Sequence, residues 1–152
     1  MSWYGALKVL HVFAAVVWVG GGAMFAMITA RLLRSRDRAA LGAVIPQLAR
    51  QVSAAGGPAS GVVLLSGIAM VLVGHIGFSA LWVRLGFGGI LLHVLFGAFI
   101  MRKRTMSLVQ AVSVPSTDET ELERAGSRMR SGMLTYLALM GAVIVVMVLK
   151  PM

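Results

Sequence analysis

Long apolar runs separated by short polar stretches form the main pattern along the chain. Four of these runs cover approximately residues 4–30, 58–76, 80–101 and 131–149. Each run is long enough to cross the ~30 Å hydrocarbon core of a bilayer, which requires about 20 helical residues. The sequence therefore predicts an all-α fold, a four-transmembrane-helix bundle in a single integral membrane domain.

The stretches between the runs give further local expectations. Residues 38–55 carry apolar side chains at helical spacing. They predict a helix on the cytoplasmic face, broken or bent at Pro46, that lies against the membrane or prolongs the second span. Pro58 suits the first turn of that span. Residues 112–123 are mostly polar, which predicts a loop in which Thr117 starts the next helix and acidic residues occupy its first turn.

The charged residues fall in short blocks beside the apolar runs. The first connection carries five arginines against one aspartate, the third carries six basic residues against four acids, and the second has no charge. Because cytoplasmic loops are enriched in Lys and Arg, the first and third connections are expected inside and both termini outside. The net charge of +9 is thus attributed to membrane topology, and no nucleic-acid partner is expected.

Composition supports a membrane protein and excludes several kinds of site. Only 12% of the 152 residues are charged and 59% are hydrophobic, which is too little charge for the surface of a soluble domain. The absence of Cys excludes disulfides, Cys-ligated metals and a thiol nucleophile. Lys8 is the only charge before Arg31, so the first run is interpreted as a retained span and not as a signal peptide.

Ionisable residues within the apolar runs are the first candidates for function, because they are costly in a membrane. Lys8 and Arg84 are expected near the outer interface, and His75 at the outer end of the second span. His11 and His93 lie well inside their spans. The two deeper histidines are therefore the strongest candidates for a buried site.

The residues around these histidines suggest a bound cofactor. Gly86, Gly89 and Gly97 lie on the same helical face as His93, which would leave room for something flat and large. On the face of His11, Trp18 lies two turns further along, among small residues. These patterns predict haem b between the two helices, with His11 and His93 as axial ligands through Nε2.

Other interpretations of the same residues remain open. Lys8 and Arg84 would pair with haem propionates, or Arg84 could simply anchor the interface. The small residues could instead serve close helix packing. His11 lies ~10 Å and His93 ~18 Å from the starts of their spans, so His75 is an alternative partner for His11. Helically spaced methionines could bind copper, namely Met24 with Met27 and Met129 with Met133.

Several short motifs resemble those of a superfamily of four-span bacterial membrane proteins. The group includes HemJ-type protoporphyrinogen oxidases, the CopD copper-resistance domain and predicted integral membrane proteins of unknown function. The similar stretches are LKVLHVFAAVVWVGG in the first run, residues 58–67 in the second, Trp82, Arg84 and His93 in the third, and the ending Lys150-Pro151. The resemblance implies the bacterial inner membrane as the location, with lipid as the surrounding partner.

HemJ proteins bind haem b and oxidise protoporphyrinogen IX, and a first-span His and a third-span Lys are important for their activity. The resemblance carries these roles over to His11 and Arg84. Arg84 replaces the Lys, however, and an Arg does not lose its proton near neutral pH. The Pro-Arg after span one and the Asn-Glu before span four of HemJ are also absent. The chain is therefore expected in the branch of predicted integral membrane proteins.

Three hypotheses about function follow. The preferred one is a haem-b-binding membrane protein with a redox role, served by a membrane redox partner. The second is a HemJ-like oxidase with a porphyrin substrate. The third is a non-catalytic membrane subunit or a copper-handling protein without haem. Glycine-rich helix faces are compatible with a homodimer in each case.

Overall fold

A computed structural model describes residues 2–114 and 116–151 of the chain. Its elements are α1 (Trp3–Ser35), α2 (Arg38–Val73), α3 (Leu81–Leu95), the π-helix η1 (Phe96–Met101), α4 (Arg102–Ser113) and α5 (Glu119–Leu149). Since α3, η1 and α4 follow one another without a break, the described residues contain four helices that are long and apolar enough to cross a membrane. The predicted all-α bundle of four apolar helices is confirmed.

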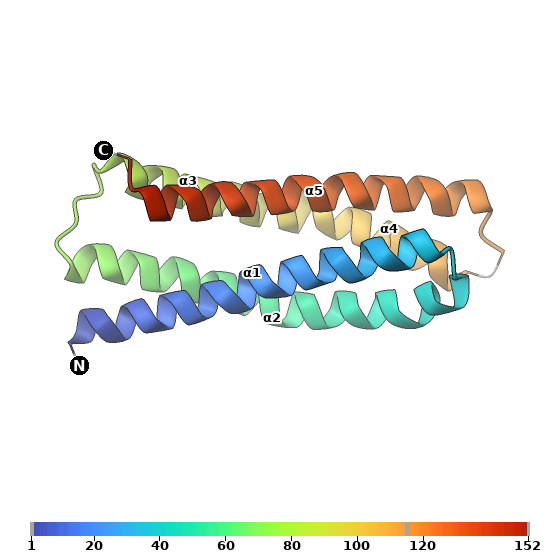
Figure 1. The fold of residues 1–152 in the computed structure, drawn as a ribbon, viewed down its shortest axis with the longest axis horizontal. Coiled ribbons are helices and arrows are strands. Elements are labelled where there is room, and N and C mark those ends of the chain that lie inside the picture. Colours follow the sequence, from blue (N-terminus) through green and yellow to red (C-terminus); the bar gives the residue numbers. More distant parts are fainter. Residues whose placement is uncertain (1, 115, 152) are drawn as a thin grey trace.

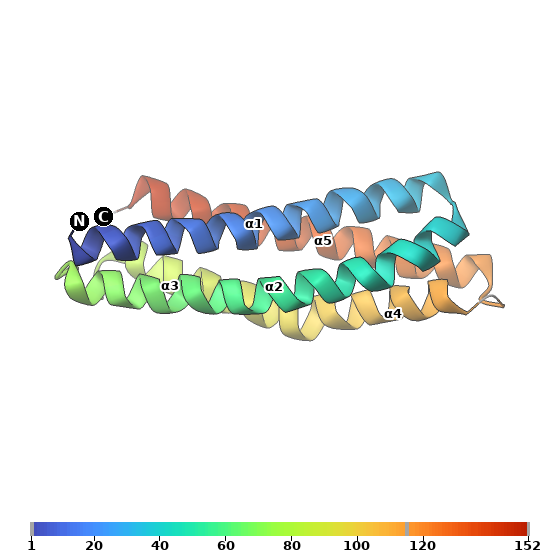
Figure 2. The ribbon, with the colours of Figure 1, turned by 90° about the horizontal axis from the view of Figure 1, so that it is seen from below.

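The four helices run up and down along one long axis (Figure 1). Both termini and the connection between α2 and α3 lie at one end, which we call the terminal end. The connections α1–α2 and α4–α5 lie at the other end (Figure 2). We call this the basic end, because residues 31–38, 102–104 and 124–130 there hold most of the arginines.

The helix α2 is continuous through two prolines. Residues 38–55 prolong the second span, which was one of the two expected arrangements, and Pro46 does not break the helix. The expectation that Pro58 lies in a first turn is wrong, because the helix has begun at Arg38. In apolar surroundings a break would leave backbone N–H and C=O groups unpaired, so the helix is favoured even across a proline.

The helices also extend further at the basic end than the polar sequence suggested. The helix α4 continues to Ser113, so the expected loop of residues 112–123 shrinks to residues 114–118. Asp118 is the N-cap residue of α5, so the expectation that Thr117 starts this helix is wrong. Glu119 and Glu121 do occupy the first turn, where negative charge is favourable. Burial of apolar side chains drives this extension.

The core is divided between the two halves of the bundle. The larger cluster occupies the basic half and consists of Phe25, Ala26, Leu41, Ile45, Leu48, Met101, Leu108, Ala111, Val112, Ala125, Met129 and Met133. The smaller cluster lies towards the terminal end and consists of Ala14, Trp18, Ala59, Val63 and Ile90. Large apolar side chains such as Phe13, Leu91 and Val148 are exposed on the outside, as expected of a surface that faces lipid.

Polar contacts tie the helix ends together at the basic end. Asp37 accepts a hydrogen bond from the backbone N–H of Ala40 at 3.0 Å and so caps α2. The guanidinium of Arg38 donates through Nη2 to the carbonyl oxygens of Val114 (3.1 Å) and Thr117 (2.7 Å). The start of α2 is thereby fastened to the connection between α4 and α5.

Candidate functional site

His11 is held by α2, not by α3. Its Nδ1 lies 2.9 Å from Oγ of Ser66, and a Cβ on Gly67 would lie 3.5 Å from its Cε1, so the ring abuts α2. The Ser66 hydroxyl lies 2.5 Å from the carbonyl oxygen of Val62, to which it donates. A hydroxyl has one proton. The Ser66 oxygen therefore accepts from Nδ1–H of His11.

This hydrogen bond determines which nitrogen of His11 is available. With the proton on Nδ1, the neutral ring keeps its lone pair on Nε2. Among the described residues the side-chain hydrogen bond of His11 is made by Nδ1, and the ring also lies near the backbone of Val63. A histidine that donates one ring N–H to another protein group, and keeps the lone pair of its other nitrogen available, has the arrangement of a metal ligand.

His93 is in a different environment, the closed centre of the bundle. It is 1% exposed. The ring of Trp18 meets it edge-on, with centroids 4.7 Å apart and planes at 81°. The ring of Tyr136 lies on another side, with centroids 4.0 Å apart. Neither Nδ1 nor Nε2 of His93 has a hydrogen-bond partner among the described residues, which is costly for a buried polar group.

The glycines near His93 accommodate side chains of α5. A Cβ on Gly97 would lie 3.5 Å from the Tyr136 ring, and one on Gly89 would lie 2.7 Å from Cγ2 of Val143. A Cβ on Gly86 would clash with the end of Met147. The space that the glycine pattern predicted for a flat group beside His93 is therefore occupied by the protein itself.

The two histidines lie at different heights. Trp18, which touches His93, follows His11 by two helical turns on α1, a rise of ~10 Å. Two axial ligands of one metal ion must each lie about 2.1 Å from it. The structure does not bring His11 and His93 together at such a site, and with Trp18 and Tyr136 in place the surroundings of His93 do not fit a haem.

The remaining expected site residues lie towards the terminal end. Lys8 is exposed, and its ammonium lies 5.3 Å from the centre of the Tyr4 ring. Arg84 on α3 is also exposed. His75 is exposed in the connection between α2 and α3, with a left-handed backbone at φ 50°. None of these three is drawn into the buried part of the bundle.

The methionines expected as an alternative copper site lie in two environments. Met24 and Met27 are 51% and 65% exposed, whereas Met129 and Met133 are 0% and 4% exposed and belong to the core. Among residues 2–114 and 116–151, no three His, Cys, Asp or Glu side chains are grouped so that they could hold a metal ion. The buried pair contributes to packing, as methionine often does.

Two residues of the site were missed at the sequence level. Ser66 is a small polar residue in an apolar run, and only the packing of α1 on α2 reveals that it meets His11. Tyr136 was detectable in principle, because it is the only aromatic residue in the stretch 131–149. A π-helical segment, η1, also begins three residues after His93, and such segments often mark functional sites.

Comparison with known proteins identifies the family but adds no activity. Residues 5–151 match the family model described as "Predicted integral membrane protein (DUF2269)". No curated protein matches the chain. No solved structure matches it either. The expected branch is thus supported over nearly the whole length, and the chain belongs to the DUF2269 family of predicted integral membrane proteins.

Proposed function

We propose that this protein binds haem b in the membrane through a single axial imidazole, that of His11. The hydrogen-bond chain from Nδ1 of His11 through Ser66 to the Val62 carbonyl carries the proposal. It fixes the ring against α2 and leaves the Nε2 lone pair for iron. Haem held by one protein ligand supplies an iron with a further coordination position, which suits substrate or gas chemistry better than simple electron transfer.

Other residues of the chain support the same location. Lys8 precedes His11 by one helical turn, so a cation lies on the terminal side of the imidazole. A cation there would pair with a propionate. Arg84 is a second exposed cation at this end. His93 in this proposal is not a ligand, and its ring packs between Trp18 and Tyr136.

Visible spectra of the detergent-purified protein test the proposal. Wild type from haem-replete cells is expected to show a Soret band that shifts on reduction with dithionite. His11→Ala is expected to lose the band, and His93→Ala to retain it. Loss in both variants would instead support ligation by both histidines. A colourless wild type would support a membrane subunit or a copper-handling protein without haem.

As a second candidate function, we infer porphyrinogen oxidation by this protein in the bacterial inner membrane. The resemblance of the first run to HemJ supports this reaction class. Complementation of a bacterial strain that lacks its porphyrinogen oxidase tests it. Growth restored by wild type but not by His11→Ala is the expected outcome, and failure of wild type to restore growth would restrict the role to another reaction.

The orientation is also part of the proposal. The basic end carries the Lys/Arg excess of both connections, which supports a cytoplasmic location for that end. Both termini and the connection between α2 and α3 would then lie outside. The haem proposed at His11 would accordingly lie in the outer half of the membrane.

A further inference from the structure

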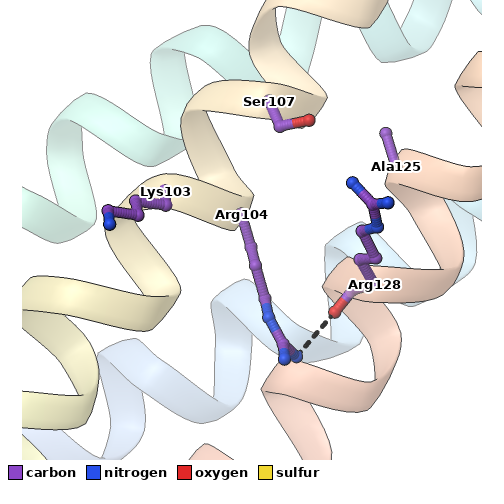
Figure 3. A pocket seen from close by; sticks show the side chains of 5 residues that line it. All are labelled: Lys103, Arg104, Ser107, Ala125 and Arg128. Carbon is purple, nitrogen blue, oxygen red and sulfur yellow. Dashed lines mark hydrogen bonds between the residues drawn. The ribbon is translucent and has the colours of Figure 1, made fainter.

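A second candidate site lies at the basic end, remote from the histidines. A pocket of about 260 Å³ opens between α4 and α5 and is lined by Lys103, Arg104, Ser107, Ala125 and Arg128. Figure 3 shows Ser107 on α4 facing the side chain of Arg128, which extends along α5 towards Ala125. Three cations and a hydroxyl thus border one hollow.

One of these cations is held in a fixed position. Arg104 donates through Nη1 to the carbonyl oxygen of Arg128 at 2.9 Å and to Oγ of Ser131 at 3.1 Å (Figure 3). Gly132 leaves space for it, since a Cβ there would lie 2.8 Å from the same Nη1. These contacts use one nitrogen of a guanidinium that offers five N–H donors. The other N–H groups of this guanidinium make no hydrogen bond within the described residues.

The charge of the pocket is not balanced by the protein. The five lining residues include no carboxylate. In the described part of the chain, the one ion pair joins Arg36 to Glu123 at 3.3 Å, which already engages an acid of this end. Arg104 and Arg128 therefore line one pocket without an acidic partner in its lining, whereas the ammonium of Lys103 points away from both guanidinium groups (Figure 3).

The depth of the pocket suggests the source of the anion. From Leu81 to Lys103 the helix rises ~33 Å, slightly more than the ~30 Å hydrocarbon core. On α5, Arg128 precedes by one turn the apolar stretch that starts at residue 131. The pocket thus lies at the level of the lipid headgroups. Basic pockets between transmembrane helices at this level bind anionic headgroups.

We propose that this pocket binds the phosphate of an anionic phospholipid headgroup. The fixed guanidinium of Arg104 and that of Arg128 would donate to the phosphate oxygens, with Ser107 as a further donor. Lys103 contributes charge at the rim, and the acyl chains would leave along the apolar surface of α3. The proposal does not depend on haem binding.

Native mass spectrometry of the full chain in detergent tests this proposal. Wild type is titrated with phosphatidylglycerol, phosphatidylcholine and inorganic phosphate in separate experiments. Preferential retention of phosphatidylglycerol is expected. In Arg104→Gln/Arg128→Gln, its apparent affinity is expected to fall at least about tenfold, because each charge-assisted hydrogen bond contributes more than a neutral one.

The matched control removes the same charge elsewhere. Arg31→Gln/Arg130→Gln lies at the same end but outside the pocket lining, and it is expected to bind phosphatidylglycerol like wild type. Circular dichroism and size-exclusion chromatography check that each variant is folded. If Arg104→Gln/Arg128→Gln does not fold, the single variant Arg128→Gln is tested in its place. Equal losses in both double variants, equal binding of phosphatidylcholine, or equally tight binding of free phosphate would overturn the proposal.

Discussion

The ring of Trp18 lies edge-on against that of His93, with centroids 4.7 Å apart, and Trp18 follows His11 by two turns of the same helix. This relationship separates two histidines that the sequence suggested as partners. It places His93 among packed aromatic rings and leaves His11 with Ser66 on α2. The bundle therefore contains one buried aromatic cluster and one imidazole with an accessible nitrogen.

Adjacent glycines in α3 test how tightly α3 packs on α5. Gly89→Ala would place its Cβ 2.7 Å from Cγ2 of Val143 and is expected to destabilise the fold by about 1–3 kcal/mol through overpacking. At Gly88 nothing lies within 4 Å, so Gly88→Ala is the control. It is expected to be neutral or slightly stabilising, by about 0.5–1 kcal/mol. Reversible unfolding in mixed detergent micelles measures both, and equal effects would refute the assigned packing.

Tyr136 is expected to be the main packing residue in the centre of the bundle. Tyr136→Ala would leave a cavity bordered by Gly22, Gly97 and His93, at a cost of about 3–5 kcal/mol. Tyr136→Phe keeps the ring and should cost far less. Leu134, 71% exposed, provides the control Leu134→Ala. The same unfolding assay applies, and a loss at Leu134 as large as that at Tyr136 would contradict this role.

Ser66 is expected to act on the haem site only through His11. Ser66→Ala removes the acceptor of Nδ1–H and should weaken haem retention about 10–100-fold, as loss of an outer hydrogen bond does at other metal sites. Ser60 on the same helix donates to the Gly57 carbonyl at 2.8 Å, so Ser60→Ala is the matched control. Haem transfer to apomyoglobin measures retention. Unchanged retention in Ser66→Ala would show that this hydrogen bond does not support a ligand.

The proposed orientation can be tested by labelling, because the chain has no native Cys. Ser79→Cys lies in the connection between α2 and α3, and Ser116→Cys in the connection between α4 and α5. In intact cells, a membrane-impermeant maleimide should label the variant at position 79 and leave the one at position 116 unlabelled until the membrane is permeabilised. The reverse labelling pattern would show the opposite topology, with both termini in the cytoplasm.

The number and type of the helices could be predicted from the sequence, but their ends at the basic end could not. Hydropathy alone specifies four spans, because about 20 apolar residues in a row have few alternatives to a transmembrane helix. The helix ends at the basic end depend on tertiary packing. Leu41 is buried there in a segment for which the sequence left two arrangements open, and Leu108 is buried beyond the predicted end of the third span.

The site could be predicted in part, for a similar reason. His11 and His93 were identifiable as costly membrane residues. Their neighbours depend on which helices touch and at what height, and spacing along one chain does not specify either. The glycines on the face of His93 predicted space for a flat bound group, and in the structure side chains of α5 occupy that space. Sequence spacing could not distinguish a haem from the ring of Tyr136, 43 residues further along the chain.

Rescue by exogenous imidazole tests most directly whether His11 is the iron ligand. His11→Gly removes the ring and leaves a space beside Ser66 that free imidazole can enter. The account predicts that this variant, purified without colour, recovers the wild-type Soret band when haem and millimolar imidazole are added together. His93→Gly should retain the band without imidazole. Full haem binding by His11→Gly in the absence of imidazole, or loss of the band in His93→Gly alone, would contradict the account.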